Sequence, residues 1–302
     1  MTSQARIEAF FDEATHTASY LVSDPGSGKA AVIDPVLDYD HASGTVGTDS
    51  ADRILAAAAR DGLSIEWLLE THVHADHLSA ASYLKARTGA PVAIGEHTPL
   101  VQANFGPVFG LDDSVADAGD FDRLLRDGET LPLGGLSIEV MHTPGHTPAC
   151  VSYRIGDAVF VGDTLFMPDY GTARTDFPGG DARRLYRSIR RLLNLPPGTR
   201  LFMCHDYKAP GRDAWAWETT VAEQRRSNVH VRDGIGEDEF VAMREARDAR
   251  LPAPALLLPS IQVNIRAGRL PAPGPGGVRY LRIPLRLSAP VEAALATSRG
   301  KA

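Results

Sequence analysis

The segment 71–77 reads Thr-His-Val-His-Ala-Asp-His, and it constrains the fold more than any other feature of the chain. It places three histidines and one aspartate within six positions, directly after the apolar stretch 67–70, which predicts a short strand. Imidazole and carboxylate groups are ligands for zinc or iron, and the end of a strand presents them together. A polar loop with incidental histidines is the weaker interpretation, because histidine is a rare residue. The candidate ligands of this motif are His72, His74, Asp76 and His77.

Three further candidate ligands each follow an apolar run that predicts a strand. His146 lies in HTPGHT, Asp163 in VGDT and His205 in MCHDY. Each alone is a weak signal, since a single histidine after a strand is more often structural. Because polar residues at successive strand ends converge on one edge of a sheet, we expect all of them at one site. Five of the ten histidines of the chain fall in these motifs.

The rest of the chain alternates short apolar runs with helix-like segments, which is typical of a mixed α/β fold. Predicted strands lie at 19–22, 30–33, 67–70, 91–94, 136–141, 150–155, 158–161 and 201–204. Predicted helices lie at 50–61, 78–88, 181–195, 218–227 and 237–250. Two similar halves of this kind predict sheets that pack between layers of helices.

The amino-acid composition of the chain changes at residue 251, where proline becomes frequent. Prolines interrupt the following segment at positions 252, 254, 259, 271, 273 and 275. We expect residues 1–250 to form one domain, and residues 251–302 to form a Pro-rich C-terminal tail that packs on the core. Within this tail, 256–258 and 278–283 are candidate short strands or docking segments.

Charge and cysteine content exclude several classes of protein. Lys and Arg number 31 against 38 Asp and Glu, and this net charge of −7 disfavours nucleic acid or an anionic membrane as a partner. No apolar run approaches the roughly 18 residues that span a bilayer, and no secretory signal is recognisable, so we expect a cytoplasmic protein. Cys150 and Cys204 are too few for a disulfide scaffold. We expect both in the core, and oxidation of Cys204 is the alternative.

The order HxHxDH, PGHT, GDT and a late histidine resembles the metallo-β-lactamase superfamily, from about residue 8 to about residue 250. The resemblance implies an αββα sandwich of two mixed β-sheets flanked by helices, with a metal site at one edge between the sheets. It makes residues 1–250 the catalytic domain. Asp34, in Val-Ile-Asp-Pro, resembles the early aspartate of the family, which would orient the ligands.

Two subfamilies resemble the chain over nearly its whole core: glyoxalase II, a thioester hydrolase, and persulfide dioxygenase. Both act on glutathione conjugates. All seven ligands hold two metals in the first, whereas two His and one Asp hold a single ferrous iron in the second. The ligands alone do not decide, since the chain has both sets. The segments THVHADHLSA, PAC and RTDF, at 71–80, 148–150 and 174–177, resemble the dioxygenase.

The dioxygenase resemblance implies that one Fe(II) per chain is held by His72, His146 and Asp163. The expected reaction oxidises glutathione persulfide with O2 to sulfite and glutathione. A further set would orient these ligands or form a second metal site: His74, Asp76, His77, His205 and Asp34. The alternative function is a dinuclear zinc thioester hydrolase of glyoxalase II type, because the second ligand set is complete. A non-catalytic binding protein is disfavoured, since it would be free to lose ligands.

Glutathione carries two carboxylates, so basic and phenolic side chains near the metal are candidates for substrate binding. The candidates are Arg174, Tyr207, Lys208, Arg212, Arg247 and Arg250. Tyr207 and Arg174 match contact residues of glyoxalase II, and Arg247 and Arg250 belong to a segment similar to its basic tail motif. The other two follow only from proximity in sequence, and a solvated helix face is the alternative for Arg247. Members that the chain resembles are often dimers, so we expect a homodimer.

Overall fold

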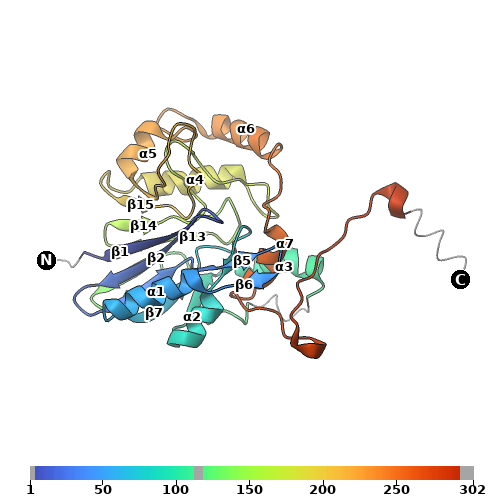
Figure 1. Cartoon of the computed structure of the whole chain (residues 1–302). Helices are drawn as coiled ribbons and strands as arrows, with labels where there is room; N and C mark the ends of the chain where they lie inside the picture. The colour runs from blue at the N-terminus through green and yellow to red at the C-terminus, as the bar shows by residue number, and fades with distance from the viewer. Residues whose placement is uncertain (1–3, 112–117, 293–302) are drawn as a thin grey trace, which may run out of the picture.

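The computed structural model describes residues 4–111 and 118–292, and two six-stranded sheets stack face to face in it (Figure 1). The first sheet has the order β1 (Arg6–Asp12), β2 (Thr17–Asp24), β3 (Lys29–Ile33), β7 (Ser64–Leu69), β9 (Val92–Gly95), β10 (Arg123–Leu125). The second has the order β11 (Thr130–Leu133), β12 (Leu136–His142), β13 (Val151–Ile155), β14 (Ala158–Phe160), β15 (Arg200–Phe202), β16 (Glu218–Thr220). Two short ladders pair β4 (Val36–Leu37) with β8 (Leu78–Ser79), and β5 (Tyr39–Asp40) with β6 (Thr45–Val46). Parallel and antiparallel pairs occur in both large sheets, which confirms the predicted mixed sandwich.

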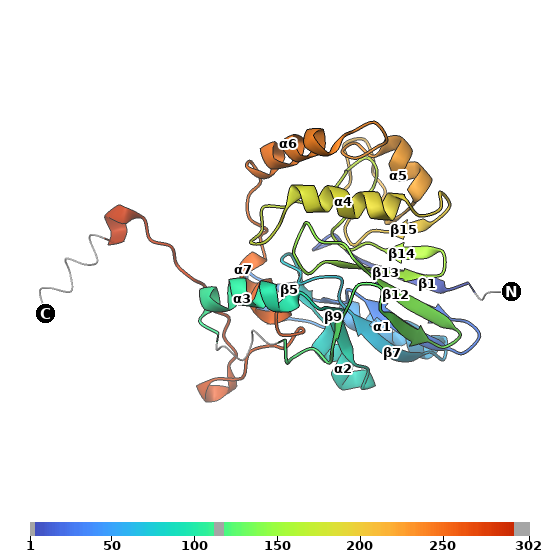
Figure 2. The same cartoon turned by 180° about the vertical axis from the view of Figure 1, so that it is seen from behind.

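Helices cover the outer face of each sheet, as Figures 1 and 2 show from opposite sides. On the side of the first sheet lie α1 (Asp49–Arg60) and α2 (Ala81–Thr88). On the side of the second sheet lie α4 (Ala182–Leu193), α5 (Val221–Ser227) and α6 (Glu237–Asp248). Two further helices, α3 (Thr98–Phe109) and α7 (Leu257–Asn264), contact each other. The layers therefore follow the order helix, sheet, sheet, helix.

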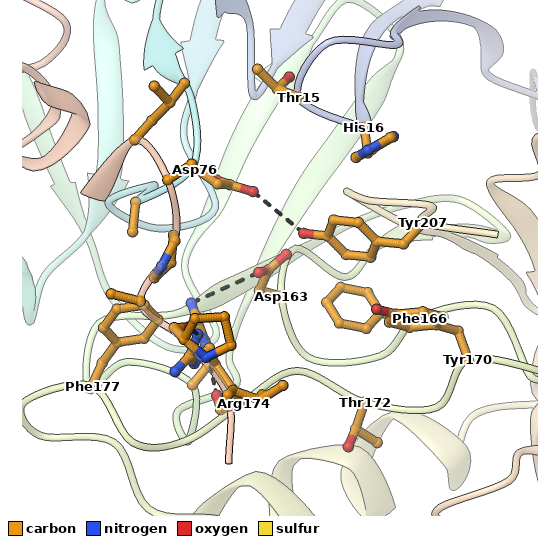
Figure 3. Close-up of a pocket in the computed structure, with 18 of the residues that line it drawn as sticks. Thr15, His16, Asp76, Asp163, Phe166, Tyr170, Thr172, Arg174, Phe177 and Tyr207 are labelled. Atoms are coloured by element: carbon orange, nitrogen blue, oxygen red, sulfur yellow. Dashed lines mark hydrogen bonds and ion pairs between the residues drawn. The ribbon is translucent and has the colours of Figure 1, made fainter. Parts of the chain in front are cut away.

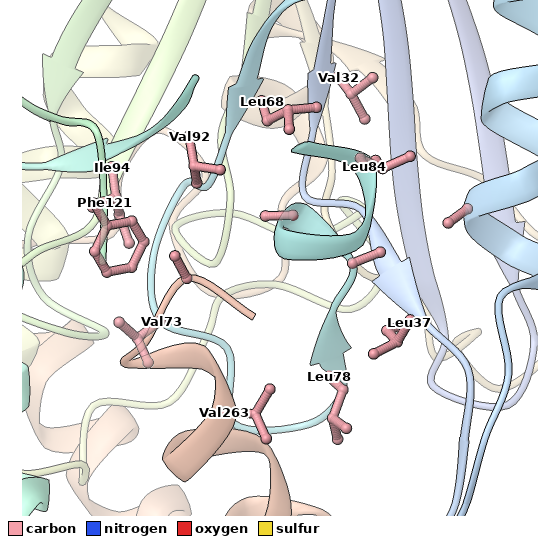
Figure 4. Close-up of a cluster of buried hydrophobic side chains, with 14 of the residues drawn as sticks. Val32, Leu37, Leu68, Val73, Leu78, Leu84, Val92, Ile94, Phe121 and Val263 are labelled. Carbon is pink, nitrogen blue, oxygen red and sulfur yellow. The ribbon is translucent and has the colours of Figure 1, made fainter. Parts of the chain in front are cut away.

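Successive side chains of a strand face either the other sheet or the covering helices, and this alternation separates the core into an inner and an outer cluster. In β3, Ala31 and Ile33 face the second sheet, whereas Ala30 and Val32 face the helices. Successive side chains of a strand point to opposite faces, so a strand with both faces buried reads as a continuous apolar run. Figure 4 shows Val32 beside Leu84 of α2 in the outer layer.

The direction of the strands determines where the site can form. β3, β7, β9 and β10 are parallel, and so are β14 and β15. β12 runs in the same direction as β14, because each pairs antiparallel with β13. The carboxyl ends of parallel strands meet at one edge of a sheet, where ligands of such folds bind.

Two predicted helices begin later than expected, and strand pairing explains both. The helix expected at 78–88 begins at Ala81, because Leu78 and Ser79 pair with β4. The helix expected at 218–227 begins at Val221, because β16 pairs with β15. Neither of the two segments expected to be short strands or docking segments forms a strand, since residues 257–258 begin α7 and 278–283 have no regular structure. Leu257, Leu258 and Leu281 pack against the core, so both segments dock on it.

The segment after residue 250 contributes to the core through α7. Ile261, Val263 and Ile265 are buried in the same cluster as the side chains of α1 and α2. Residues 283–292 extend away from the sandwich (Figure 1), and 293–302 lie outside the described residues. The domain boundary at residue 250 stays a prediction. No described helix has the length and apolar character that crossing a membrane requires.

Candidate metal centre

Four loops at one edge of the sandwich carry the predicted ligands. The loop after β7 holds His72, His74, Asp76 and His77, and the loops after β12, β14 and β15 hold His146, Asp163 and His205. The ring centroids of His72 and His146 are 5.1 Å apart, and those of His77 and His205 are 6.2 Å apart. The structure thus brings together residues that the sequence spreads over more than a hundred positions.

His72, His146 and Asp163 form a compact trio whose ligand atoms all lie within 4.8 Å of one another. Nε2 of His72 and Nε2 of His146 lie 4.0 and 3.8 Å from Asp163 Oδ2. His146 Nδ1 donates to the carbonyl oxygen of Arg174 at 2.8 Å. His72 Nδ1 donates to the Thr71 hydroxyl at 3.0 Å, since the proton of that hydroxyl goes to a buried carboxylate. Each Nε2 therefore carries a bare lone pair.

His77 and His205 show the same arrangement. His77 Nδ1 donates to the carbonyl oxygen of the next residue at 3.1 Å, and His205 Nδ1 donates to the carbonyl oxygen of His16 at 3.3 Å. Nε2 of both rings is buried without a hydrogen-bond partner in the described chain, as is Asp163 Oδ1. His205 Nε2 lies 3.0 Å from Asp76 Oδ2 and 3.4 Å from Asp163 Oδ1.

These donors fit a transition metal. Buried polar atoms without a partner are costly, and a cation bound between bare imidazole nitrogens and carboxylate oxygens removes that cost. Imidazole and carboxylate are the ligand types of zinc and of non-haem iron. The trio would hold one ion, and the residues around His77 and His205 offer the donors for another.

Burial keeps the imidazoles of His72 and His77 in the neutral form that binds metal. It lowers the pKa of His72 well below its ordinary value, and neighbouring histidines lower that pKa further. It lowers the pKa of His77 to about 3. Burial also raises the pKa of the Asp163 carboxyl in the metal-free chain, so metal binding and loss of its proton are coupled.

His74 differs, because two buried carboxylates contact it. Its Nε2 lies 3.0 Å from Asp34 Oδ1 and 3.3 Å from Glu70 Oε2. Burial alone lowers the pKa of His74, but the two carboxylates outweigh it and raise that pKa well above its ordinary value. Asp34 also accepts hydrogen bonds from the backbone N–H and the hydroxyl of Thr71, at 2.7 and 2.8 Å. Asp34 therefore holds the loop after β7, which carries four of the candidate ligands.

The glycine of the PGHT motif lets α4 approach the loop after β12, which carries His146. Gly145 has a φ of +148°, and a Cβ at this position would lie 2.3 Å from the Cα of Leu185. The N–H of Asp181, the N-cap of α4, donates to the carbonyl oxygen of Gly145 at 2.8 Å. The start of α4 thereby fixes the backbone next to His146.

A cavity of about 580 Å³ opens onto the trio (Figure 3). Its wall includes His72, His146, Asp163 and Asp76, together with the aromatic residues Phe166, Tyr170, Phe177 and Tyr207. Basic residues on the wall are Arg174, Arg244 and Arg247, and segment 251–256 completes it. The cavity thus combines apolar surface with cationic groups beside the ligands.

A model of the metallo-beta-lactamase superfamily matches residues 13–205. The chain belongs to this superfamily. A probable metallo-hydrolase of Burkholderia pseudomallei is 61% identical over 290 residues, which is 92% of this chain and 98% of that protein. Glyoxylase B2 of Dictyostelium discoideum is 47% identical, covering 94% of this chain and 98% of that protein. A beta-lactamase hydrolase-like protein of Agrobacterium fabrum is 52% identical, and this chain spans 64% of its length.

The solved structure of ETHE1 from Myxococcus xanthus resembles this one closely. The TM-score is 0.71 at 33% identity, covering 87% of this chain and 100% of that chain. The human mitochondrial persulfide dioxygenase ETHE1 is 27% identical over 265 residues, which is 87% of this chain and 88% of that protein. Superfamily membership and the predicted fold are thereby confirmed.

The candidate substrate residues fall into two groups in this member of the superfamily. Tyr207, Arg174 and Arg247 line the cavity. Among the described residues, the cavity wall does not include Lys208, Arg212 or Arg250. The ammonium of Lys208 instead lies 3.9 Å above the ring of a tryptophan. The guanidinium of Arg212 is held by Asp206 and Asp169, and Arg250 is exposed beyond the end of α6.

Several site residues have no signal of their own in the sequence. His16 lines the cavity from the turn between β1 and β2, with a φ of +58°. Phe166 and Tyr170, in the loop after β14, pack edge-on and tilted against the ring of Tyr207. Arg244 stands in the predicted basic motif, but its burial depends on its ion pair with Asp248. The contacts of Tyr207 join residues far apart in the sequence, whereas Arg244 and Asp248 lie one turn apart on α6.

The two cysteines are buried, as expected. The thiol of Cys150 contacts the hydroxyl of Thr147 at 3.1 Å, and burial raises its pKa to about 12. Cys204 Sγ lies 3.6 Å from Asp34 Oδ2, and burial also raises the pKa of this thiol. A buried thiol with a raised pKa is a poor nucleophile and a poor target for oxidants.

Proposed function

We propose that this protein is a persulfide dioxygenase, which oxidises glutathione persulfide with O2 to sulfite and glutathione at one ferrous iron. The observation that carries the proposal is the set of ligands open to the cavity. His72, His146 and Asp163 line it with Asp76, whereas His74, His77 and His205 do not. Two histidines and one carboxylate on an accessible wall are the ligand set of non-haem iron oxygenases.

His72, His146 and Asp163 would hold the iron, which would supply the redox chemistry between dioxygen and the terminal persulfide sulfur. In the overall reaction, the sulfur gains three oxygen atoms, two from O2 and one from water. The S–S bond breaks, O2 accepts the four electrons that the sulfur loses, and glutathione leaves as a thiol. The chain's own contribution is to hold the two rings with Nε2 bare, through the Thr71 hydroxyl and the carbonyl of Arg174.

The cavity also suits glutathione, a flexible peptide with two carboxylates. Arg174 and Arg247 would bind those carboxylates, since a guanidinium offers paired donors. The guanidinium of Arg174 is already oriented by Asp176 and by the carbonyl oxygen of Pro252. Tyr207, with its hydroxyl 3.5 Å from Asp76 Oδ2, lies between the ligands and the aromatic wall. Similarity to ETHE1, whose human relative is named persulfide dioxygenase, supports the same substrate.

The second candidate function is a dinuclear thioester hydrolase. The buried, unpartnered Nε2 atoms of His77 and His205 favour it, because a second cation would bind them together with Asp76 and Asp163 Oδ1. The names metallo-hydrolase and glyoxylase among the relatives support it as well.

Metal analysis combined with an oxygen electrode separates the two functions. The dioxygenase binds about one iron per chain and consumes one O2 for each sulfite formed from glutathione persulfide. The hydrolase binds two zinc ions and cleaves S-lactoylglutathione without oxygen uptake. Asp163→Ala should abolish iron binding, whereas His77→Ala should keep most of it. Equal loss of metal in both variants, with hydrolysis in the wild type, would refute the dioxygenase.

A further inference from the structure

The side chain of Asn264, the last residue of α7, reaches the loop that carries the ligands. It is 4% exposed and makes two hydrogen bonds to this loop and one to β8, the short strand that follows it. Its Oδ1 accepts from the N–H of Ser79 at 2.8 Å, and its Nδ2 donates to the carbonyl oxygens of His74 and His77 at 2.9 and 2.7 Å. Two of its three partners are therefore backbone groups of candidate ligands.

We propose that Asn264 is a positioning residue of the metal centre, which fixes the backbone of segment 74–79 so that its side chains meet the metal. The residue lies outside the superfamily match at 13–205. The proposal rests on the proposed metal centre, and it holds for either candidate function. It makes α7 part of the centre, although α7 belongs to the segment expected to be a tail.

The chemistry of the carboxamide suits this task. One acceptor and two donors on a single planar group match one N–H and two carbonyl groups. An aspartate would lose both donors, and an apolar residue would leave all three backbone groups buried without this partner. Such groups seek other partners, so the loop would shift when the amide is removed.

Neighbouring contacts hold Asn264 rigidly against the loop. Val263, next to it in α7, is buried beside Val73 and Leu78 (Figure 4). Gly268, with a φ of +76°, approaches Ser79 so closely that a Cβ there would lie 2.5 Å from its carbonyl oxygen. The hydroxyl of Ser79 donates to the carboxylate of Glu70, which contacts His74. The end of α7 and the turn after it therefore enclose the end of the ligand loop.

The chain offers a matched control on the same helix. Gln262 is also a buried amide of α7, at 5% exposure, and it too makes three hydrogen bonds. Its partners are the carbonyl oxygens of Leu258 and Arg282 and the N–H of Arg282, none of which belongs to the ligand loop. Gln262→Ala therefore removes the same number of buried hydrogen bonds from α7, and none of them involves the ligand-bearing loop.

The experiment measures Co²⁺ affinity by chelator competition, and the visible spectrum of the Co²⁺ protein, for the full chain. We expect Asn264→Ala to weaken Co²⁺ binding at least tenfold and to change the spectrum, as outer hydrogen-bond partners of ligands generally do. Gln262→Ala should match the wild type in both readouts. Wild-type affinity and spectrum in Asn264→Ala, or equal loss in the two variants, would overturn the proposal. A wild type that binds no Co²⁺ would instead refute the metal centre itself.

Two further measurements keep the proposal testable if Asn264→Ala does not fold. Asn264→Asp retains the volume and the acceptor for Ser79, and it should lose affinity as well, because both donors are absent. In the metal-free wild type, the amide of Ser79 should exchange hydrogen as slowly as the core amides of α7, since its acceptor lies on that helix. If this amide exchanged as fast as an exposed one, the proposed role of Asn264 would be contradicted by the wild-type protein alone.

Discussion

The buried ion pair between Arg244 and Asp248 should be essential for the stability of the cavity wall. Both side chains lie on α6, with exposures of 1% and 4%. Arg244 donates to Asp248 Oδ1 from Nε at 2.9 Å and from Nη2 at 2.5 Å, and from Nη1 to the carbonyl oxygen of Thr172 at 3.1 Å. Asp248 Oδ2 accepts from the N–H and the hydroxyl of Thr175, at 2.8 and 3.0 Å. The pair thus ties α6 to the loop that carries Arg174.

Asp248→Ala leaves the guanidinium of Arg244 buried without its partner. Removing one member of a buried ion pair costs about 3–5 kcal/mol, because an uncompensated charge remains. The two groups of Thr175 lose their acceptor as well, so we expect a value in the upper part of this range. Burial already lowers the pKa of Arg244, which reflects the cost of the charge at this position.

Urea unfolding of the metal-free protein measures this cost, and α6 supplies a control. Asp238, on the same helix, pairs with Arg183, but their exposures are 90% and 44%. Asp238→Ala should therefore cost less than about 1 kcal/mol, as exposed pairs do. The double variant Arg244→Met, Asp248→Leu should regain most of the free energy of unfolding that Asp248→Ala loses, since no charge stays buried. A cost for Asp248→Ala as small as that for Asp238→Ala would refute the reasoning.

Four further outcomes follow from the structure. Gly145→Ala should unfold at a lower urea concentration and bind less iron, since its Cβ would collide with Leu185. Burial lowers the pKa of His230 to about 4. His230 therefore binds more protons in the unfolded state between pH 4 and 6.5, and this residue should contribute at most roughly 3 kcal/mol to the rise of stability with pH there. His230→Gln should flatten this dependence, and an unchanged slope would contradict it. Removal of metal by a chelator should lower the melting temperature reversibly, because the ion binds only the folded chain. Tyr207→Phe should raise the KM for glutathione persulfide more than it lowers kcat, and an unchanged KM would argue against substrate contact.

Much of the fold could be predicted because its signals are local. The continuous apolar runs of β3 and β14 mark strands that are buried on both faces. Short edge strands such as β10 and β16 have no such pattern, and they form because a partner strand is already present. The helix α7 was missed for a related reason, since prolines and a run of leucines conceal a segment whose burial comes from the core around it.

The ligand residues were predictable because metal chemistry requires rare residue types at strand ends. Proximity to His205 in the sequence did not predict which basic residues line the cavity. Lys208 and Arg212 follow His205 by three and seven positions, yet their side chains lie against Trp215 and Asp206. A loop can reverse direction within one or two residues, so neighbours along the chain need not face the same cavity.

The sequence by itself determined the superfamily, the sheet sandwich and the seven candidate ligands, because strand periodicity and ligand spacing are properties of short segments. Only the tertiary structure decided which imidazole nitrogen is bare, which ligands face the cavity and which residue holds the ligand loop. Each of these depends on hydrogen bonds across the fold, such as that between Asn264 and His77, which are 187 positions apart. Their formation depends on how the whole core packs, and no local pattern of residues encodes that.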